Sequence, residues 1–304
     1  MDPVLITGTS GFIGFQVAER LCVAGYDVLG PDLRPPLPGA LFRHEVGDIT
    51  SLATLSKLLA GRQNLIHAGA ISGPMLIKDD PHGVAHVNLG GGMTVFEAGR
   101  LVKLRSLVSA SSIAVYGDQP ALDAVQEDTK PNPQSFYGHT KLAGEALLHG
   151  YVQHYGLNAV ALRISSVCGV RRDTLCNLNS VIKAGLQGRP AQASAENTSF
   201  RQYVHVKDAA SAVIAVLSAE STPGFVYNIA GGTYMTEAAI ARMIGEALPG
   251  LVIEYGPPAW NEHHISLLNI KAAACDFGYQ PSVYLREGLA ELIAHFATST
   301  GPSA

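Results

Sequence analysis

Short apolar runs alternate with amphipathic stretches along the first half of the chain. Runs such as residues 4–6 and 65–67 are too short for helices and predict buried strands, whereas residues 136–155 predict a long helix. This alternation is typical of a parallel sheet covered by helices on both faces, so we predict an α/β fold with a doubly wound, Rossmann-type parallel sheet. The expected strands are residues 4–6, 26–29, 65–67, 106–109 and 159–163, and the expected helices are residues 11–23, 51–59, 84–101 and 136–155.

The pattern becomes less regular after about residue 165. The elements expected there are helices at residues 177–187, 207–218 and 236–247, the last capped by Thr236, and a strand at residues 225–229. We interpret residues 1–165 as a dinucleotide-binding domain and residues 166–304 as mainly a smaller C-terminal substrate-binding lobe. Residues from about 200 to 230 are expected to return to the first domain.

The composition is that of a globular protein. Hydrophobic residues make up 47% of the 304 positions and charged residues only 15%, which excludes a disordered chain. The net charge is −4 and both signs are scattered, so we expect no nucleic-acid partner. No apolar run is long enough to predict a membrane span. The four cysteines form no C-x-x-C pair, which favours a reducing cytoplasm over a disulfide framework or a metal site.

A glycine-rich segment links the first predicted strand to the first predicted helix. Gly8, Gly11 and Gly14 are spaced G-x-x-G-x-x-G, and the absence of Cβ atoms allows a tight turn and close approach of a pyrophosphate to the backbone. The helix N-terminus adds N–H donors and a partial positive charge. We therefore expect this loop to bind a dinucleotide through Gly8, Ser10, Gly11, Phe12, Ile13 and Gly14.

Acidic residues near the ends of later segments bear on the choice of cofactor. Asp32 follows Gly14 by 18 residues and ends the second predicted strand, where a carboxylate accepts both adenosine ribose hydroxyls and repels a 2′-phosphate. This favours NAD over NADP. Arg34 opposes that interpretation because an arginine can hold the phosphate, unless it points into water. Asp48, followed by Ile49, is expected either to bond the adenine amine or to cap the next helix.

Tyr137 and Lys141 lie four residues apart on the longest predicted helix and so share one face. A phenol titrates near pH 10, but a neighbouring ammonium and the positive nicotinamide ring stabilise the phenolate. Tyr137 is then able to take an alcohol proton while a hydride leaves the same carbon.

Serines follow a predicted strand at the edge where α/β sheets bind ligands. Ser111 and Ser112 lie in this segment, and a hydroxyl there is placed to orient a substrate alcohol.

Taken together, these motifs show that the sequence resembles the extended short-chain dehydrogenase/reductase family, best known for nucleotide-sugar epimerases and dehydratases. The resemblance covers nearly the whole chain. The matching motifs, in family order, are residues 8–14, 67–70, 111–117, 137–141, 162–163, 201–208 and 227–229.

The resemblance implies specific roles for these residues. Ser112 would orient the alcohol, Tyr137 would be the acid/base, and Lys141 would contact both the tyrosine and the nicotinamide ribose. Asn88 matches the family asparagine near the cofactor. The remaining residues expected to line the cofactor are His67, Ala68, Gly69 and Ile164.

The sequence also departs from the family pattern. Dehydratases carry an Asp-Glu pair where this chain has Ile113 and Ala114, so elimination is disfavoured. Nucleotide-sugar enzymes have an asparagine at the position of Ser166. They have a glycine-rich strand where this chain has residues 193–200, and a phosphate-clamping arginine near residues 260–264.

These departures favour a substrate smaller than a nucleotide sugar. We expect Arg201 or the pair Arg171 and Arg172 to hold a small acidic group, because a diphosphate needs more donors. The full set of expected substrate-binding residues is Ser72, Ser111, Ser166, Arg171, Arg172 and Arg201.

Three functions remain open from the sequence. The first is an NAD-dependent dehydrogenase or reductase of a free sugar, sugar acid or similar small polyol. The second is a nucleotide-sugar epimerase that retains NAD, and the third is a non-enzymatic NAD-sensing protein. The resemblance further implies a homodimer that pairs through residues 84–101 and 136–155.

Overall fold

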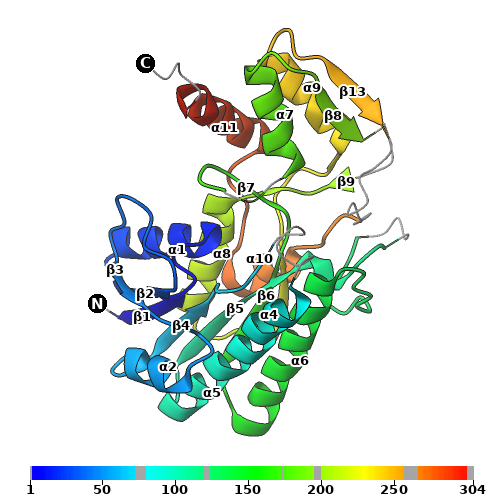
Figure 1. Ribbon diagram of the computed structural model, residues 1–304. Coiled ribbons are helices and arrows are strands. Elements are labelled where there is room, and N and C mark those ends of the chain that lie inside the picture. The colour runs from blue at the N-terminus through cyan, green and yellow to red at the C-terminus, as the bar shows by residue number, and fades with distance from the viewer. Residues whose placement is uncertain are drawn as a thin grey trace.

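Seven parallel strands form the central sheet of the computed structural model, which describes residues 2–72, 80–119, 124–172, 174, 176–194, 200–256 and 266–299 (Figure 1). The strand order is β11-β6-β5-β4-β1-β2-β3. The chain order therefore reverses beside β1, and such a switch point is where open α/β sheets bind ligands. The bounds are β1 (Pro3–Thr7), β2 (Asp27–Asp32), β3 (Arg43–Val46), β4 (Asn64–His67), β5 (Ser106–Ser112), β6 (Ala159–Ile164) and β11 (Val226–Ile229).

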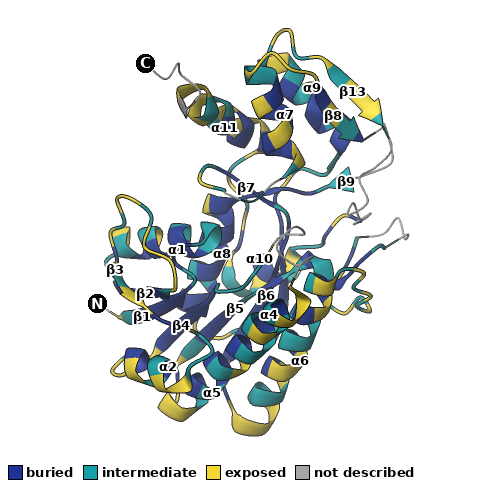
Figure 2. Cartoon of the chain, in the orientation of Figure 1, coloured by how far each residue is buried: buried dark blue, intermediate teal, exposed yellow. Residues whose placement is uncertain are grey.

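Alternate residues of the strands face two separate cores. In β1, Val4 and Ile6 lie in one apolar cluster and Leu5 lies in the other. The first cluster is completed by α1 (Phe12–Val23) and α8 (Val206–Ser218), and the second by α2 (Leu52–Leu59), α5 (Gly92–Val102) and α6 (Phe136–Tyr155). Figure 2 shows the strands mainly in the buried colour, with exposed residues on the outer faces of α2 and α6. The predicted doubly wound α/β fold is thus confirmed.

A second group of elements forms a smaller lobe with its own core. Strand β8 (Ala191–Ser194) pairs in parallel with β13 (Ile253–Gly256). Helices α7 (Asn177–Leu186), α9 (Glu237–Ala247) and α11 (Leu285–Ser299) pack together through leucine and isoleucine side chains. Figure 1 shows this lobe beyond one edge of the sheet. The division at residue 165 remains our interpretation.

Helix α6 has the bounds predicted for it. Ser135 caps its N-terminus by accepting a hydrogen bond from the Gly138 amide, and Gly156 ends it in the left-handed conformation with a φ of 67°. Helix α9 is capped by Thr236, as predicted.

The helix predicted over residues 84–101 is wrong in detail. It starts earlier, as α4 (Pro81–Ala85), continues through a π-helical segment η1 (His86–Gly91), and then becomes α5. Asp80 caps α4, with Pro81 at its first position. The π segment includes Gly90 and Gly91, which are poor helix formers, and it carries Asn88.

Among the described residues, no helix is both long and apolar enough to cross a membrane.

Further elements were not predicted from the pattern. The unpredicted elements are β3, η2 (Ile113–Val115), β7 (Val167–Cys168), β8, β9 (Phe200–Arg201), β10 (Val204–His205), β12 (Met235–Thr236), β13, α10 (Lys271–Phe277) and α11.

Candidate active site

The glycine loop lies at the switch point of the sheet, against the end of β4. Gly8 has a φ of +77°, and a Cβ there would lie 2.6 Å from the backbone of Gly69. A Cβ on Gly14 would lie 2.2 Å from the carbonyl oxygen of Gly8. The turn is therefore closed to any side chain at either position.

The start of α1 faces this turn and suits a pyrophosphate. Gly11 is the N-cap and supplies no side-chain oxygen to the helix. The first-turn amides of Phe12, Ile13 and Gly14 have no acceptor within the helix, and they carry the positive end of the helix dipole. The residues present thus fit the diphosphate of a dinucleotide.

Asp32 and Arg34 both contact Ser10 in the glycine loop. The Ser10 amide donates to Asp32 Oδ2 at 3.0 Å, and the Arg34 amide donates to Asp32 Oδ1 at 2.9 Å. Arg34 Nη2 donates to the Ser10 carbonyl at 2.8 Å. Arg34 therefore does not simply point into water, because its guanidinium is held across the loop.

Asp48 and Ile49 lie just before α2. Asp48 Oδ1 accepts from both the amide and the hydroxyl of Thr50 at 2.8 Å, whereas Ser51 caps α2. The alternative that Asp48 caps this helix is wrong, and its contact with adenine remains a prediction. Ile49 packs beside Gly91 of the π segment.

The end of β4 is fastened to the end of β1. Thr7 Oγ1 lies 2.8 Å from His67 Nδ1 and accepts from the Gly69 amide at 3.2 Å, and the Ala68 amide donates to the Thr7 carbonyl at 3.3 Å. Burial, with a smaller contribution from Lys141, lowers the pKa of His67 to about 3. His67 is therefore neutral at physiological pH.

Asn88 connects the π segment to two other parts of the site. Its Oδ1 accepts from the Ile71 amide at 2.8 Å, and its Nδ2 donates to the Ile71 carbonyl at 3.1 Å and to Thr140 Oγ1 at 3.2 Å. Thr140 Oγ1 donates in turn to the Tyr137 carbonyl at 2.8 Å. Asn88 thus ties the segment that leads to exposed Ser72 to the first turns of α6.

Ser112, Tyr137 and Lys141 come together where β5 ends and α6 begins. The Ser112 hydroxyl lies close enough to the Tyr137 phenol to act on its acidity. Lys141 Nζ lies 5.6 Å from the centroid of the Tyr137 ring and donates to the Ala110 carbonyl of β5 at 2.8 Å. The strand end and the helix therefore hold the three side chains in one cluster.

Burial changes the acidity of both titratable members of this cluster. It raises the pKa of the Tyr137 phenol to about 12, an increase that the nearby Ser112 hydroxyl opposes. It lowers the pKa of the Lys141 ammonium to about 8, a decrease that the Glu145 carboxylate opposes. Tyr137 is thus protonated at neutral pH before any cofactor charge is added.

Three predicted site residues near the strand ends, Ser111, Ile164 and Ser166, differ in burial and in contacts. Ser111 was expected to contact substrate, but its hydroxyl is buried and donates to Glu145 Oε1 at 2.5 Å, because successive residues of a strand point to opposite faces. Ile164 is buried at the end of β6. The Ser166 side chain is half-buried, and its carbonyl accepts from the Val204 amide at 2.9 Å.

The three candidate arginines have separate protein partners. Arg201 Nε lies 2.9 Å from Glu237 Oε1 in a largely buried ion pair. The Arg171 guanidinium lies 4.5 Å from the ring centroid of Phe15. Arg172 donates to the Val167 carbonyl at 2.5 Å and to Thr174 Oγ1 at 3.1 Å.

The predicted arginine pair therefore does not converge on one anion, because Arg171 turns to α1 and Arg172 to its own loop. Glu237, which also accepts from Asn177 and Ser194, was missed from the sequence. The sequence indicated only that Glu237 lies in the first turn of a predicted helix, where an acidic side chain interacts favourably with the helix dipole. Residues 195–199 and 257–265, including Trp260, lie outside the described residues.

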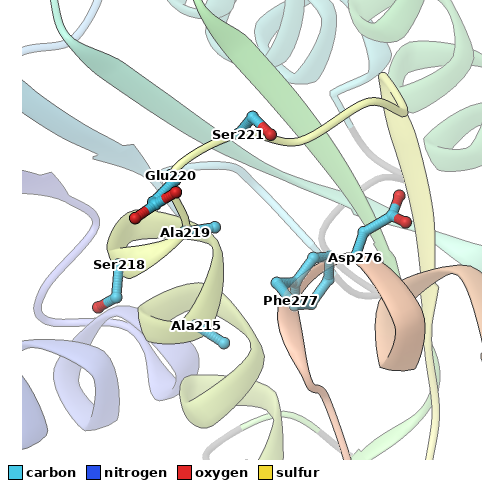
Figure 3. A pocket seen from close by; sticks show the side chains of 7 residues that line it. All are labelled: Ala215, Ser218, Ala219, Glu220, Ser221, Asp276 and Phe277. Carbon is cyan, nitrogen blue, oxygen red and sulfur yellow. The ribbon is translucent and has the colours of Figure 1, made fainter.

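An open hollow lies well away from this cluster, where α8 ends (Figure 3). Its lining includes Glu220, Asp276 and Phe277. The chain enters β11 from this side, and Asp276 accepts a hydrogen bond from Tyr227 near the start of that strand. The hollow is therefore at the amino edge of the sheet, opposite the edge where cofactors bind.

Comparison with known proteins gives one family match. The model of the NAD dependent epimerase/dehydratase family matches residues 4–230. A UDP-glucose 4-epimerase of Mycolicibacterium smegmatis is 31% identical over 96% of this chain and 97% of its own length. A UDP-glucuronate 4-epimerase of Arabidopsis thaliana is 25% identical over 95% of this chain and 74% of its own length.

Solved structures give the same family. A UDP-glucuronic acid 4-epimerase from Bacillus cereus, solved with UDP-glucuronic acid and NAD, has a TM-score of 0.88 and 27% identity, covering 98% of this chain and 99% of its own. A Thermus thermophilus UDP-glucose 4-epimerase solved with NAD has a TM-score of 0.86 and 27% identity, covering 97% and 98%.

Proposed function

The chain belongs to the NAD dependent epimerase/dehydratase family, and from that premise we propose that it is an NAD-dependent oxidoreductase acting at a secondary alcohol or ketone carbon of a small carbohydrate. The substrate class is a free sugar, a sugar acid or a similar polyol. The observation that carries this proposal is the cluster of Ser112, Tyr137 and Lys141 at the carboxyl edge of the sheet.

The residues of the cluster divide the chemistry between them. NAD, when bound, accepts or returns the hydride. The Ser112 hydroxyl holds the substrate oxygen beside the Tyr137 phenol, and Tyr137 takes or gives the proton of that oxygen. The Lys141 ammonium favours the phenolate, so it counters the effect of burial, which raises the pKa of Tyr137 to about 12.

The second lobe supports a substrate without a diphosphate. Arg201 is already paired with the Glu237 carboxylate, and only 13% and 7% of the two side chains are exposed. A diphosphate brought to this guanidinium would meet a buried negative charge. The pairing with Glu237 therefore makes Arg201 a poor partner for a diphosphate or a smaller acidic group.

A UDP-sugar 4-epimerase is the second candidate. It is favoured by the full-length similarity to proteins of that activity. The two candidates share the hydride and proton transfers but differ in their net reaction, because a dehydrogenase releases NADH whereas an epimerase returns the hydride to its substrate.

A substrate screen separates the two candidates. Free sugars, sugar acids and UDP-sugars are incubated with enzyme and excess NAD, and NADH absorbance and sugar products are followed together. We expect NADH to accumulate with a free sugar or sugar acid, in amounts that match the oxidised product. Epimerised UDP-sugar without net NADH would establish the second candidate instead.

We also propose a homodimer and a cytoplasmic location. Large apolar side chains are exposed on the two helices expected to pair, Met93 and Leu101 on α5 and Leu147 and Tyr155 on α6. The four cysteines are unpaired in the structure, which is typical of a reducing compartment. Light scattering during size-exclusion chromatography tests the dimer, and a monomeric mass would contradict it.

A further inference from the structure

A buried ion pair lies one helical turn beyond Lys141. Glu145 Oε2 accepts from Arg163 Nη2 at 2.7 Å, and Arg163 Nε lies 3.0 Å from Glu145 Oε1. Only 6% of each side chain is exposed. Buried pairs of this kind add little stability over apolar residues, so stability alone does not explain the charges.

The pair is built into the same strand end that holds the catalytic cluster. Ser111 donates to Glu145, the residue before it supplies the carbonyl that accepts from Lys141, and the residue after it is Ser112. Arg163 is fixed from its other side, where it donates to the Tyr116 hydroxyl at 2.8 Å. The positions of both charges are thus set by several contacts.

On α6 the spacing is Tyr137, Lys141 and Glu145, with four residues at each step, so the three side chains lie along one face. The carboxylate is therefore the near charge to Lys141, and Arg163 lies behind it on β6.

We propose that Glu145 is a positioning residue that keeps Lys141 protonated beneath Tyr137, with Ser111 and Arg163 holding its carboxylate in place. The proposal rests on the proposed function, since it concerns the ammonium that supports the acid/base.

The effect on Lys141 agrees in direction with the geometry. Burial lowers the pKa of Lys141 to about 8, and Glu145 opposes that decrease. In the part of the chain that the structure describes, two further titratable groups face Lys141: Tyr137 on the same helix, and His67 of β4. Both are neutral near pH 7, so Glu145 and Arg163 supply the fixed charges behind the ammonium.

This arrangement predicts shifts of opposite sign for the two halves of the pair. Glu145→Gln removes the near negative charge and leaves the guanidinium, so Lys141 should lose its proton at lower pH. Arg163→Gln leaves an unpaired carboxylate, so Lys141 should keep its proton to higher pH. A purely structural role would not give opposite signs.

Competitive labelling of the apo protein with acetic anhydride, followed by peptide mass spectrometry, measures the titration of Lys141 itself. We expect the labelling midpoint to fall by about one pH unit or more in Glu145→Gln and to rise in Arg163→Gln, the usual size for a nearby charge. The matched control is Glu97→Gln, which breaks the more exposed Glu97–Arg100 pair on α5 and should leave the midpoint unchanged.

The double variant Glu145→Gln with Arg163→Gln removes both charges and, because the carboxylate is the nearer charge, should still lower the midpoint, by less than Glu145→Gln alone. The double variant also allows the proposal to be tested if either single variant fails to fold. An unchanged midpoint in every folded variant, or shifts of the same sign in both single variants, would overturn the proposal. The labelling needs no substrate, so a failure of the proposed function would appear separately, as turnover that survives without Tyr137.

Discussion

The contacts of single side chains bear on the choice between NAD and NADP. Asp32 accepts from the Ser10 amide and from the Arg34 amide, while the Arg34 guanidinium is held on the Ser10 carbonyl. A negative and a positive charge therefore lie together where the adenosine ribose is expected. The carboxylate repels a 2′-phosphate, and the guanidinium beside it would attract one.

Asp32→Ala is expected to narrow the difference in affinity between NAD and NADP, because it removes the repulsion and leaves Arg34. Isothermal titration of both cofactors into the apo protein measures it. Asp27→Ala is the matched control, since Asp27 starts the same strand and pairs with Arg43 in an exposed ion pair. An unchanged ratio of affinities in Asp32→Ala would show that this carboxylate does not meet the 2′ position.

His67 makes the folding stability depend on pH. Its folded pKa of about 3 lies below the ordinary value of 6.5, so the neutral form stabilises the fold at high pH. This contribution is lost as the pH falls below 6.5, because the unfolded chain then binds the proton. Between pH 7 and pH 5 the loss is about 2 kcal/mol, at 1.36 kcal/mol for each pH unit.

Urea unfolding of the wild type and of His67→Gln at both pH values measures this loss. We expect the wild type to lose about 2 kcal/mol more than the variant over that interval. His139→Gln, which changes an exposed histidine of α6, should behave as the wild type does. Equal losses in the wild type and His67→Gln would mean that His67 is not held neutral.

Among whole elements, those with a full apolar period were the predictable ones. Helix α6 and the inner strands carry regularly spaced apolar residues that pack into the two cores, so the sequence pattern predicts where these elements lie. Strand β3 has no such pattern, since it lies at the edge of the sheet and three of its four residues are exposed. The π segment depends on contacts of Asn88 with Ile71 and Thr140, which lie 17 and 52 residues away.

The cap of α6 should matter for catalysis as well as for stability. Ser135 caps the turn that carries Tyr137, so Ser135→Ala is expected to cost about 1 kcal/mol and to lower turnover. Ser51→Ala removes the cap of α2, which carries no site residue, and should cost a similar free energy with turnover unchanged. Urea unfolding and steady-state kinetics give both quantities. Equal turnover in Ser135→Ala and Ser51→Ala would show that the cap of α6 does not contribute to catalysis.

At the scale of the whole molecule, the sequence predicted the first domain more fully than the second lobe. The cofactor loop is one turn, and Tyr137 and Lys141 share one helix face, so most of the site is encoded in local motifs. The lobe brings together Asn177, Ser194, Arg201 and Glu237 from different elements. Spacing along the chain does not encode such a meeting, and the arginines were therefore assigned to an anion that the structure does not favour.

Glu237→Gln tests how the lobe selects its substrate. The substitution removes the charge beside Arg201 but keeps the shape, so the NAD-loaded variant should bind uridine diphosphate at least about tenfold more tightly than the wild type. Glu246→Gln removes an equal charge from the surface of the same helix and should change nothing. Micromolar binding of uridine diphosphate by the wild type would instead favour the epimerase.

The most direct test of the account is turnover by Tyr137→Phe, measured as NADH formation with the free sugar or sugar acid that the wild type oxidises best. The phenyl ring keeps the packing but cannot carry the proton, so we expect turnover to fall by roughly 10²–10⁴ while NAD affinity and folding stay as in the wild type. Activity above a tenth of the wild-type value in a folded, NAD-binding variant would contradict the assignment of Tyr137 as the acid/base.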